Sequence, residues 1–144
     1  MNITGSRAYQ TGASVWQAED IEHEWPNGIE LTLESVRLFQ QRGLDIGNWM
    51  SSLLTKDQQW SLRVALAPAL RARLAVENRA HRAHLDTVCR ALNSFRQGGS
   101  YPQLDAELAS AHAARRALLA PAWTIYMETW AGAFVQVLQT GACH

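Results

Sequence analysis

Residues 68–97 read PALRARLAVENRAHRAHLDTVCRALNSFRQ and form the longest helical pattern in the chain. At the helical step of 100° per residue, six apolar side chains fall on one face. They are Leu70, Leu74, Leu85, Val88, Leu92 and Phe95. Most arginines of the segment fall towards the other side. The segment therefore predicts an amphipathic helix whose leucine stripe faces a core.

A polar group interrupts this stripe. His81 lies in its middle, with Glu77 and His84 on one flank. Spacings of four and three residues let these side chains meet on one helix. His112, on the next predicted helix, could complete a shell of ligands. Because imidazole and carboxylate suit zinc, iron, manganese or nickel, the group Glu77, His81, His84 and His112 is a candidate site for a divalent transition metal.

Two other interpretations of this group stay open. A buried Glu77 and His81 can hydrogen bond to each other and fix the helix register, since leaving such groups unpaired costs about 1–3 kcal/mol. Alternatively, the stripe reaches solvent at this point. We favour the hydrogen-bonded pair, because the chain has no HExxH motif and no repeated ExxH motif. We name no catalytic residue, because no obvious nucleophile or phosphate-binding loop accompanies the histidines.

The composition indicates a globular protein without a strong charge preference. The chain has 144 residues, of which 47% are apolar, and its formal net charge is zero. These values fit one domain and argue against nucleic-acid binding. The cysteines, Cys89 and Cys143, form no disulfide or zinc-binding pattern. We expect a cytoplasmic protein without a membrane span, because no secretory signal and no long uncharged apolar run is visible.

The charges are unevenly distributed along the chain. Residues 19–34 contain six acids and no lysine or arginine, whereas residues 56–96 contain eight bases and three acids. Opposite charges attract, so we expect the acidic segment to pack against the basic helix or to steer towards it. Such an attraction could act within one chain or between chains.

The N-terminal part predicts an arm followed by short helices. Residues 1–14 are polar and predict a flexible arm, and residues 15–144 predict a single helical domain. Ser14 is a candidate N-cap for a helix that ends near Glu24. The sequence Trp25-Pro26-Asn27-Gly28 then predicts a turn.

Residues 29–34 allow two interpretations. Their alternation of apolar and polar side chains fits a strand, but the following residues continue as a helix, so we favour a helix over 29–42 that Gly43 stops. A short helix is predicted over 44–54. Thr55 and Gln58 have the spacing of a capping box, which predicts another helix from there. Pro68 can lie within that helix or in the first turn of a new one.

The C-terminal half predicts a helical hairpin. Gly98 and Gly99 end the first long helix, and Ser100 is a candidate cap for a second helix that Pro121 should bend. A short connection favours antiparallel neighbours, and counting outward from it brings His84 within about a turn of His112 or Arg116. The predicted fold is therefore all-α, a single-domain bundle of five to six helices with a long C-terminal hairpin.

Aromatic residues give the remaining functional prediction. The chain has six tryptophans, and a helical stripe near the C-terminus contains Trp123, Tyr126, Trp130 and Phe134. Such a stripe forms a core, lines an apolar ligand pocket or covers a dimer interface. We predict a non-enzymatic binding or interaction protein that uses an aromatic-rich pocket or dimer surface, with itself, another protein or a small apolar ligand as partner. The alternative is a metal-binding bundle, even a metal-dependent enzyme, centred on the Glu/His group.

Overall fold

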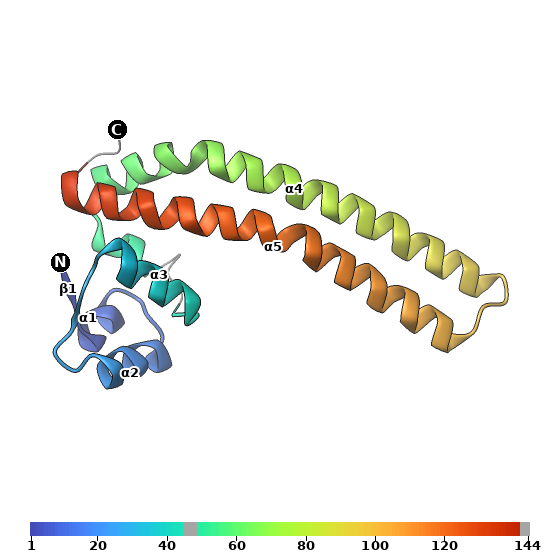
Figure 1. Cartoon of the computed structure of the whole chain (residues 1–144), viewed down its shortest axis with the longest axis horizontal. Coiled ribbons are helices and arrows are strands. Elements are labelled where there is room, and N and C mark those ends of the chain that lie inside the picture. Colours follow the sequence, from blue (N-terminus) through green and yellow to red (C-terminus); the bar gives the residue numbers. More distant parts are fainter. Residues whose placement is uncertain (45–48, 142–144) are drawn as a thin grey trace. The chain divides into compact units, whose positions relative to one another are not determined.

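The computed structural model describes residues 1–44 and 49–141 (Figure 1). The elements in chain order are β1 (Asn2–Ile3), α1 (Gly5–Gln10), α2 (Val15–Glu24), β2 (Ile29–Glu30), α3 (Leu33–Gln41), the 3₁₀ helix η1 (Met50–Leu53), α4 (Lys56–Arg96) and α5 (Tyr101–Thr140). Helices dominate the described residues, and the two strands have two residues each. The prediction of an all-α fold is therefore confirmed.

The chain divides into two compact units. The first unit comprises residues 1–67 and 127–144, and the hairpin unit comprises residues 68–126. The first unit contains the largest fully buried side chains among the described residues: Phe39, Phe134, Ile3, Ile21, Leu44, Met50, Val36 and Val137. Its core therefore combines the short N-terminal elements with the end of α5. The prediction that residues 15–144 form a single domain stays a prediction.

The first fourteen residues differ from the predicted arm. β1 pairs antiparallel with β2, with Asn2 opposite Glu30 and Ile3 opposite Ile29. Ile3 is fully buried, and so is Ala8 of α1. This segment therefore contributes to the core of the first unit. Local sequence missed it because the partner of β1 lies 27 residues further along the chain.

A helix cap and a turn in this unit form where the local sequence predicts them. Ser14 caps α2 in a capping box, where the Ser14 N–H donates to Gln17 Oε1 at 2.8 Å and the Gln17 N–H donates to Ser14 Oγ at 3.4 Å. After α2, the Gly28 N–H donates to the Trp25 carbonyl at 2.8 Å, and Gly28 has a φ of 83° that favours glycine. The predicted cap and turn are both confirmed.

The helix predicted over 29–42 was wrong in its first turn. Ile29 and Glu30 form β2, and α3 begins only at Leu33. Thr32 sets this start, since its N–H donates to Ser35 Oγ at 2.8 Å and its hydroxyl accepts from the Ser35 N–H at 3.2 Å. The end of α3 before Gly43, whose φ is 65°, agrees with the prediction. The helix predicted over 44–54 falls partly on residues 45–48, outside the described residues.

α4 and α5 are the predicted hairpin and lie side by side in Figure 1. The capping box at the start of α4 is confirmed, with the Thr55 N–H donating to Gln58 Oε1 at 2.9 Å. α4 continues through Pro68 and α5 through Pro121. Gly98 turns the chain with a φ of 107°, and Ser100 Oγ then accepts the Gln103 N–H at 3.3 Å.

Candidate functional site

Alanines form the contact line of the hairpin unit. Its three buried residues are Ala80 and Ala91 of α4 and Ala111 of α5. Small side chains let two helix backbones approach closely, and this approach leaves little room for larger residues along the line. The helices therefore meet along alanines, not along the leucine stripe of α4.

Three of the six residues of the leucine stripe are exposed, although the sequence predicts that the stripe faces a core. Leu74 is 42% exposed, Leu85 is 47% exposed and Leu92 is 36% exposed. At 100° per residue, these leucines lie about 120° around α4 from Ala80 and Ala91. Because α5 is the single neighbouring helix within the hairpin unit, it covers one side of α4 and leaves the leucines open.

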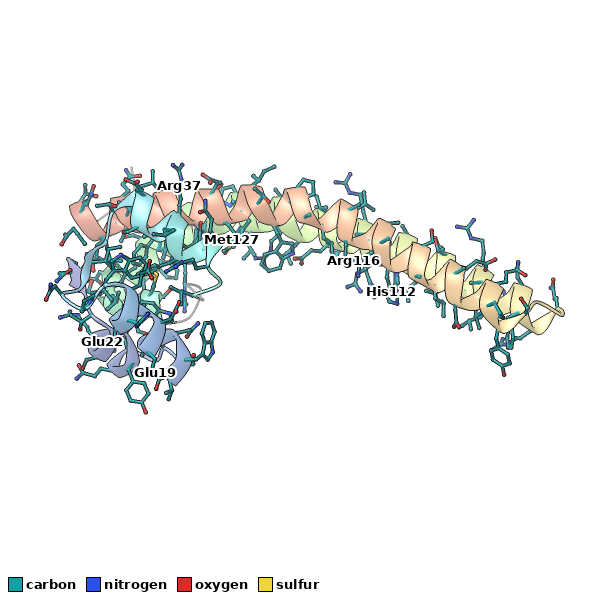
Figure 2. All side chains as sticks on the ribbon, turned by 60° about the horizontal axis from the view of Figure 1, so that its bottom comes forward. Glu19, Glu22, Arg37, His112, Arg116 and Met127 are labelled. Atoms are coloured by element: carbon teal, nitrogen blue, oxygen red, sulfur yellow. The ribbon has the colours of Figure 1, made fainter. Side chains whose placement is uncertain are left out.

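The predicted Glu/His group does not form one cluster, because its members contact different partners. Glu77 is half-buried and its Oε1 lies 3.3 Å from Arg73 Nε, so it pairs with an arginine and not with His81. His81 is exposed. His84 contacts His112 across the hairpin, with ring centroids 4.9 Å apart. This contact confirms the register of the hairpin, which the sequence predicts by counting outward from the loop between α4 and α5. On α5, His112 is followed one turn later by Arg116 (Figure 2).

The described residues give the metal prediction no geometric support. Within 1–44 and 49–141, no three residues among histidine, cysteine, aspartate and glutamate lie close enough together to hold a metal ion. Glu77, His81, His84 and His112 therefore do not gather into one shell there, and the metal site stays a prediction. Over the same residues, no helix has the length and apolar character needed to cross a membrane.

The aromatic stripe is divided between the two units. Trp130 and Phe134 are buried in the first unit with their rings stacked 4.9 Å apart, so they belong to its core. Trp123 and Tyr126 belong to the hairpin unit. The Arg73 guanidinium lies over both rings, 4.4 Å from the Trp123 centroid and 4.3 Å from the Tyr126 centroid. These cation–π contacts hold Trp123 against α4 while 43% of its surface remains exposed.

A small cavity lies between the helices of the hairpin unit. Its volume is about 250 Å³, and its lining residues are Ala80, Ala83, His84, Thr87, Ser110, Ala111, Ala114, Arg115 and Leu118. His84 Nδ1 and Arg115 Nε are buried there without a hydrogen-bond partner. Arg115 is not among the predicted site residues, because nothing in helical spacing distinguishes it from the neighbouring Arg116.

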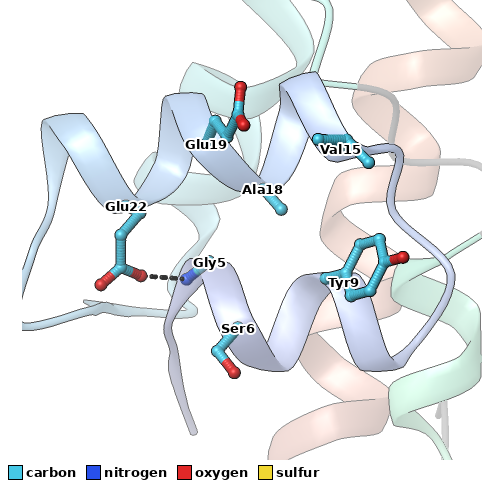
Figure 3. Close-up of a pocket in the computed structure, with 7 residues that line it drawn as sticks. All are labelled: Gly5, Ser6, Tyr9, Val15, Ala18, Glu19 and Glu22. Atoms are coloured by element: carbon cyan, nitrogen blue, oxygen red, sulfur yellow. Dashed lines mark hydrogen bonds between the residues drawn. The ribbon is translucent and has the colours of Figure 1, made fainter.

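A second, more open hollow of about 480 Å³ lies between α1 and α2 in the first unit (Figure 3). Tyr9 and Val15 line it and are more than half exposed. Glu19 and Glu22 supply acidic groups, and Glu22 Oε2 accepts the Gly5 N–H at 3.1 Å. The hollow is thus an apolar surface with an acidic edge.

Comparisons with protein-family models, curated proteins and solved structures find no match to this chain. The functional proposal therefore rests on the chain's own residues. The two units differ in charge: the hairpin unit has eight arginines and four acids, a formal charge of +4, and the first unit has five bases and nine acids, a formal charge of −4. The uneven charge distribution in the sequence thus coincides with the division into units.

Proposed function

We propose that this protein is a non-enzymatic interaction protein that associates with itself through the leucine face of the hairpin unit. The leucine face comprises Leu74, Leu85 and Leu92 of α4. The observation that carries the proposal is their exposure of 36–47% in a unit whose buried residues are all alanines. Single exposed leucines are common on protein surfaces, but an aligned row of them is typical of an interaction site.

The leucine face lies in a sector of α4 that contains no formally charged side chain. The sector of α4 between 80° and 140° from Ala80 contains Leu70, Leu74, His81, Leu85, Val88 and Leu92. No aspartate, glutamate, lysine or arginine falls in this sector between residues 70 and 92. Burying a charged side chain would oppose association, so an uncharged surface is well suited to being covered.

Trp123 of α5 extends this surface. In an antiparallel helix pair, the position of a residue can be counted from the buried alanine of its own helix, at 100° per residue. Residues that are rotated from that alanine in the same sense then project from the same side of the pair. Trp123 and His112 are rotated from Ala111 in the same sense as the leucines from Ala80. The contacts of His112 with His84 and of Trp123 with Arg73 agree with this geometry. An exposed tryptophan beside leucines is typical of the centre of an interface.

A four-helix bundle is the simplest arrangement that covers this surface. Two hairpins that pack face to face enclose the leucines in a shared core, as in many helical bundles. The homodimer also explains why the sequence places leucines, and not polar residues, on a face that the single chain leaves exposed. The same reasoning favours a partner whose own surface is apolar over a small ligand, since the leucines form a face and not a cavity.

Neighbouring substitutions on α4 test the proposal. Leu74→Glu puts a charge into the leucine face, whereas Ala75→Glu puts the same charge on an exposed position about 100° away. We expect Leu74→Glu to weaken the homodimer at least about tenfold, since each copy would bury a carboxylate, and Ala75→Glu to leave its dissociation constant unchanged. Sedimentation equilibrium measures both constants. Equal effects of the two variants, or none, would contradict the proposal.

A further inference from the structure

The spacing of the apolar residues on α4 identifies how the second copy binds. We infer that two copies pack antiparallel, α4 against α4, with the two-fold axis at His81. This inference rests on the proposed self-association and adds the orientation and register of the partner. Five residues of the uncharged sector of α4 carry it, and they are Leu70, Leu74, His81, Val88 and Leu92.

These residues are spaced symmetrically about His81. Leu74 and Val88 lie seven residues on either side of it, and Leu70 and Leu92 lie eleven residues on either side. A two-fold interface requires that whenever residue i contacts residue j, residue j also contacts residue i. An antiparallel pair centred on His81 meets this condition with apolar partners. Leu70 of one copy then faces Leu92 of the other, and Leu74 faces Val88.

The remaining leucine fits the same register. Leu85 lies four residues after His81, and the residue four before it is Glu77. Glu77 is already paired with Arg73 at 3.3 Å and is half-buried, so its carboxylate is turned to a partner on its own chain. The leucine of the second copy therefore meets the aliphatic part of Glu77. The exposed His81 of each copy lies at the axis, where both imidazoles remain close to solvent.

Charge distinguishes this arrangement from one in which the two-fold axis runs along the helices. If the two-fold axis ran along the helices, α4 of one hairpin would cover α5 of the other. The corresponding sector of α5 carries Asp105 and Arg116, both exposed. The leucine face would then cover charged residues, which costs desolvation energy. An axis across the helices instead places the uncharged sector of α4 on its own copy and the sector of α5 with Asp105 and Arg116 on α5 of the second copy, so the leucines meet apolar residues.

Disulfide cross-linking tests the orientation directly, in full-length protein with Cys89 and Cys143 replaced by serine. A disulfide requires Cα atoms within about 7 Å. In the antiparallel arrangement, position 74 lies opposite position 88 of the second copy. Two copies of position 74 are then about 21 Å apart, from fourteen residues at 1.5 Å each. We therefore expect Leu74→Cys mixed with Val88→Cys to form a heterodimeric disulfide, and Leu74→Cys alone to form none.

Mass spectrometry after mild oxidation identifies the cross-linked pairs, and Ala75→Cys mixed with Val88→Cys is the control for random collision. His81→Cys should cross-link with itself. If Leu74→Cys cross-links with Trp123→Cys, which lies level with it on α5, and not with Val88→Cys, then α4 of one copy covers α5 of the other and the antiparallel inference is overturned, while self-association stands. If native protein sediments as a single chain and no mixture exceeds the control, the inference and the proposed function both fail. Sedimentation of each variant before oxidation, with its helix content by circular dichroism, shows that it is folded.

Discussion

Glycine at position 5 is required by a close approach between two backbones. A Cβ atom there would overlap the carbonyl oxygen of Ala18 and the side chain of Glu22, because α1 crosses α2 at this residue. Gly5 also donates its N–H to Glu22, which fixes the two helices to each other. The contact is a backbone contact, so no side-chain rearrangement can relieve the overlap.

We therefore expect Gly5→Ala to lower the free energy of unfolding by about 1–3 kcal/mol, the usual effect of overpacking. Gly132 provides the control, because it lies within α5 and a Cβ there meets nothing within 4 Å. Alanine is the better helix former, so Gly132→Ala should raise the free energy of unfolding by about 0.5–1 kcal/mol. Urea unfolding followed by circular dichroism measures both changes. A Gly5→Ala variant as stable as the native protein would contradict the described packing of α1 on α2.

The residues of the Glu/His group show what helical spacing can and cannot predict. Spacing placed Glu77, His81 and His84 within reach of one another, and the count across the connection placed His84 beside His112. Spacing could not reveal that Arg73, one turn before Glu77, competes for its carboxylate. The Arg73 guanidinium and the Glu77 carboxylate carry opposite charges, so the ion pair is the favoured contact.

Among the helices and strands, residues close in sequence determine where the helices begin and end. Contacts between residues far apart in sequence determine the strand pairing and the face of α4 that is buried. Ser14, Thr55 and Gly98 act as the sequence predicts, because caps and turns depend on a few neighbouring residues. β1 could not be predicted, because a two-residue strand has no periodicity and forms only through a distant partner. β2 lies in the segment 29–34, whose alternation also fits a strand, but the helical pattern that follows it favoured a helix. Spacing alone could not show which residues of α4 contact α5, because the buried alanines of α4 form a second, narrower line that allows closer packing.

The proposed dimer has a consequence for α5. Counting from the contacts of His84 with His112 and Phe95 with Tyr101 places residues 115 and 116 level with His81. The antiparallel arrangement therefore brings Arg116 of both copies near the two-fold axis. Like charges repel, and removing an exposed repulsion of this kind is worth about 0.2–1 kcal/mol.

We expect Arg116→Gln to tighten the dimer by a factor of about two to five at low ionic strength. Arg79→Gln is the control, because Arg79 is exposed and lies about 140° around α4 from Leu74, on the side away from the leucines. Sedimentation equilibrium at two salt concentrations measures the effect, which should shrink as salt is added. A dimer that Arg116→Gln weakens would contradict the proposed position of α5 at the axis.

At the scale of the whole molecule, the chain contains two units of different construction. The first unit has a core of large apolar side chains that includes Phe39, Phe134 and Val137. The hairpin unit buries alanines and exposes leucines. A pair of helices has too little buried surface for independent stability, so this unit gains most from a second copy. The sequence predicted self-association through an aromatic-rich surface, and we propose the leucine face, with Trp123 beside it, as the surface that associates.

The solution mass of the native protein tests the central claim most directly. Sedimentation equilibrium should show a two-chain complex of twice the 16.1 kDa chain mass that dissociates on dilution. The leucine face is uncharged, so the association should persist when salt screens the +4 and −4 charges of the two units. A single-chain mass at every concentration up to about 1 mM, the range of weak association, would contradict the account.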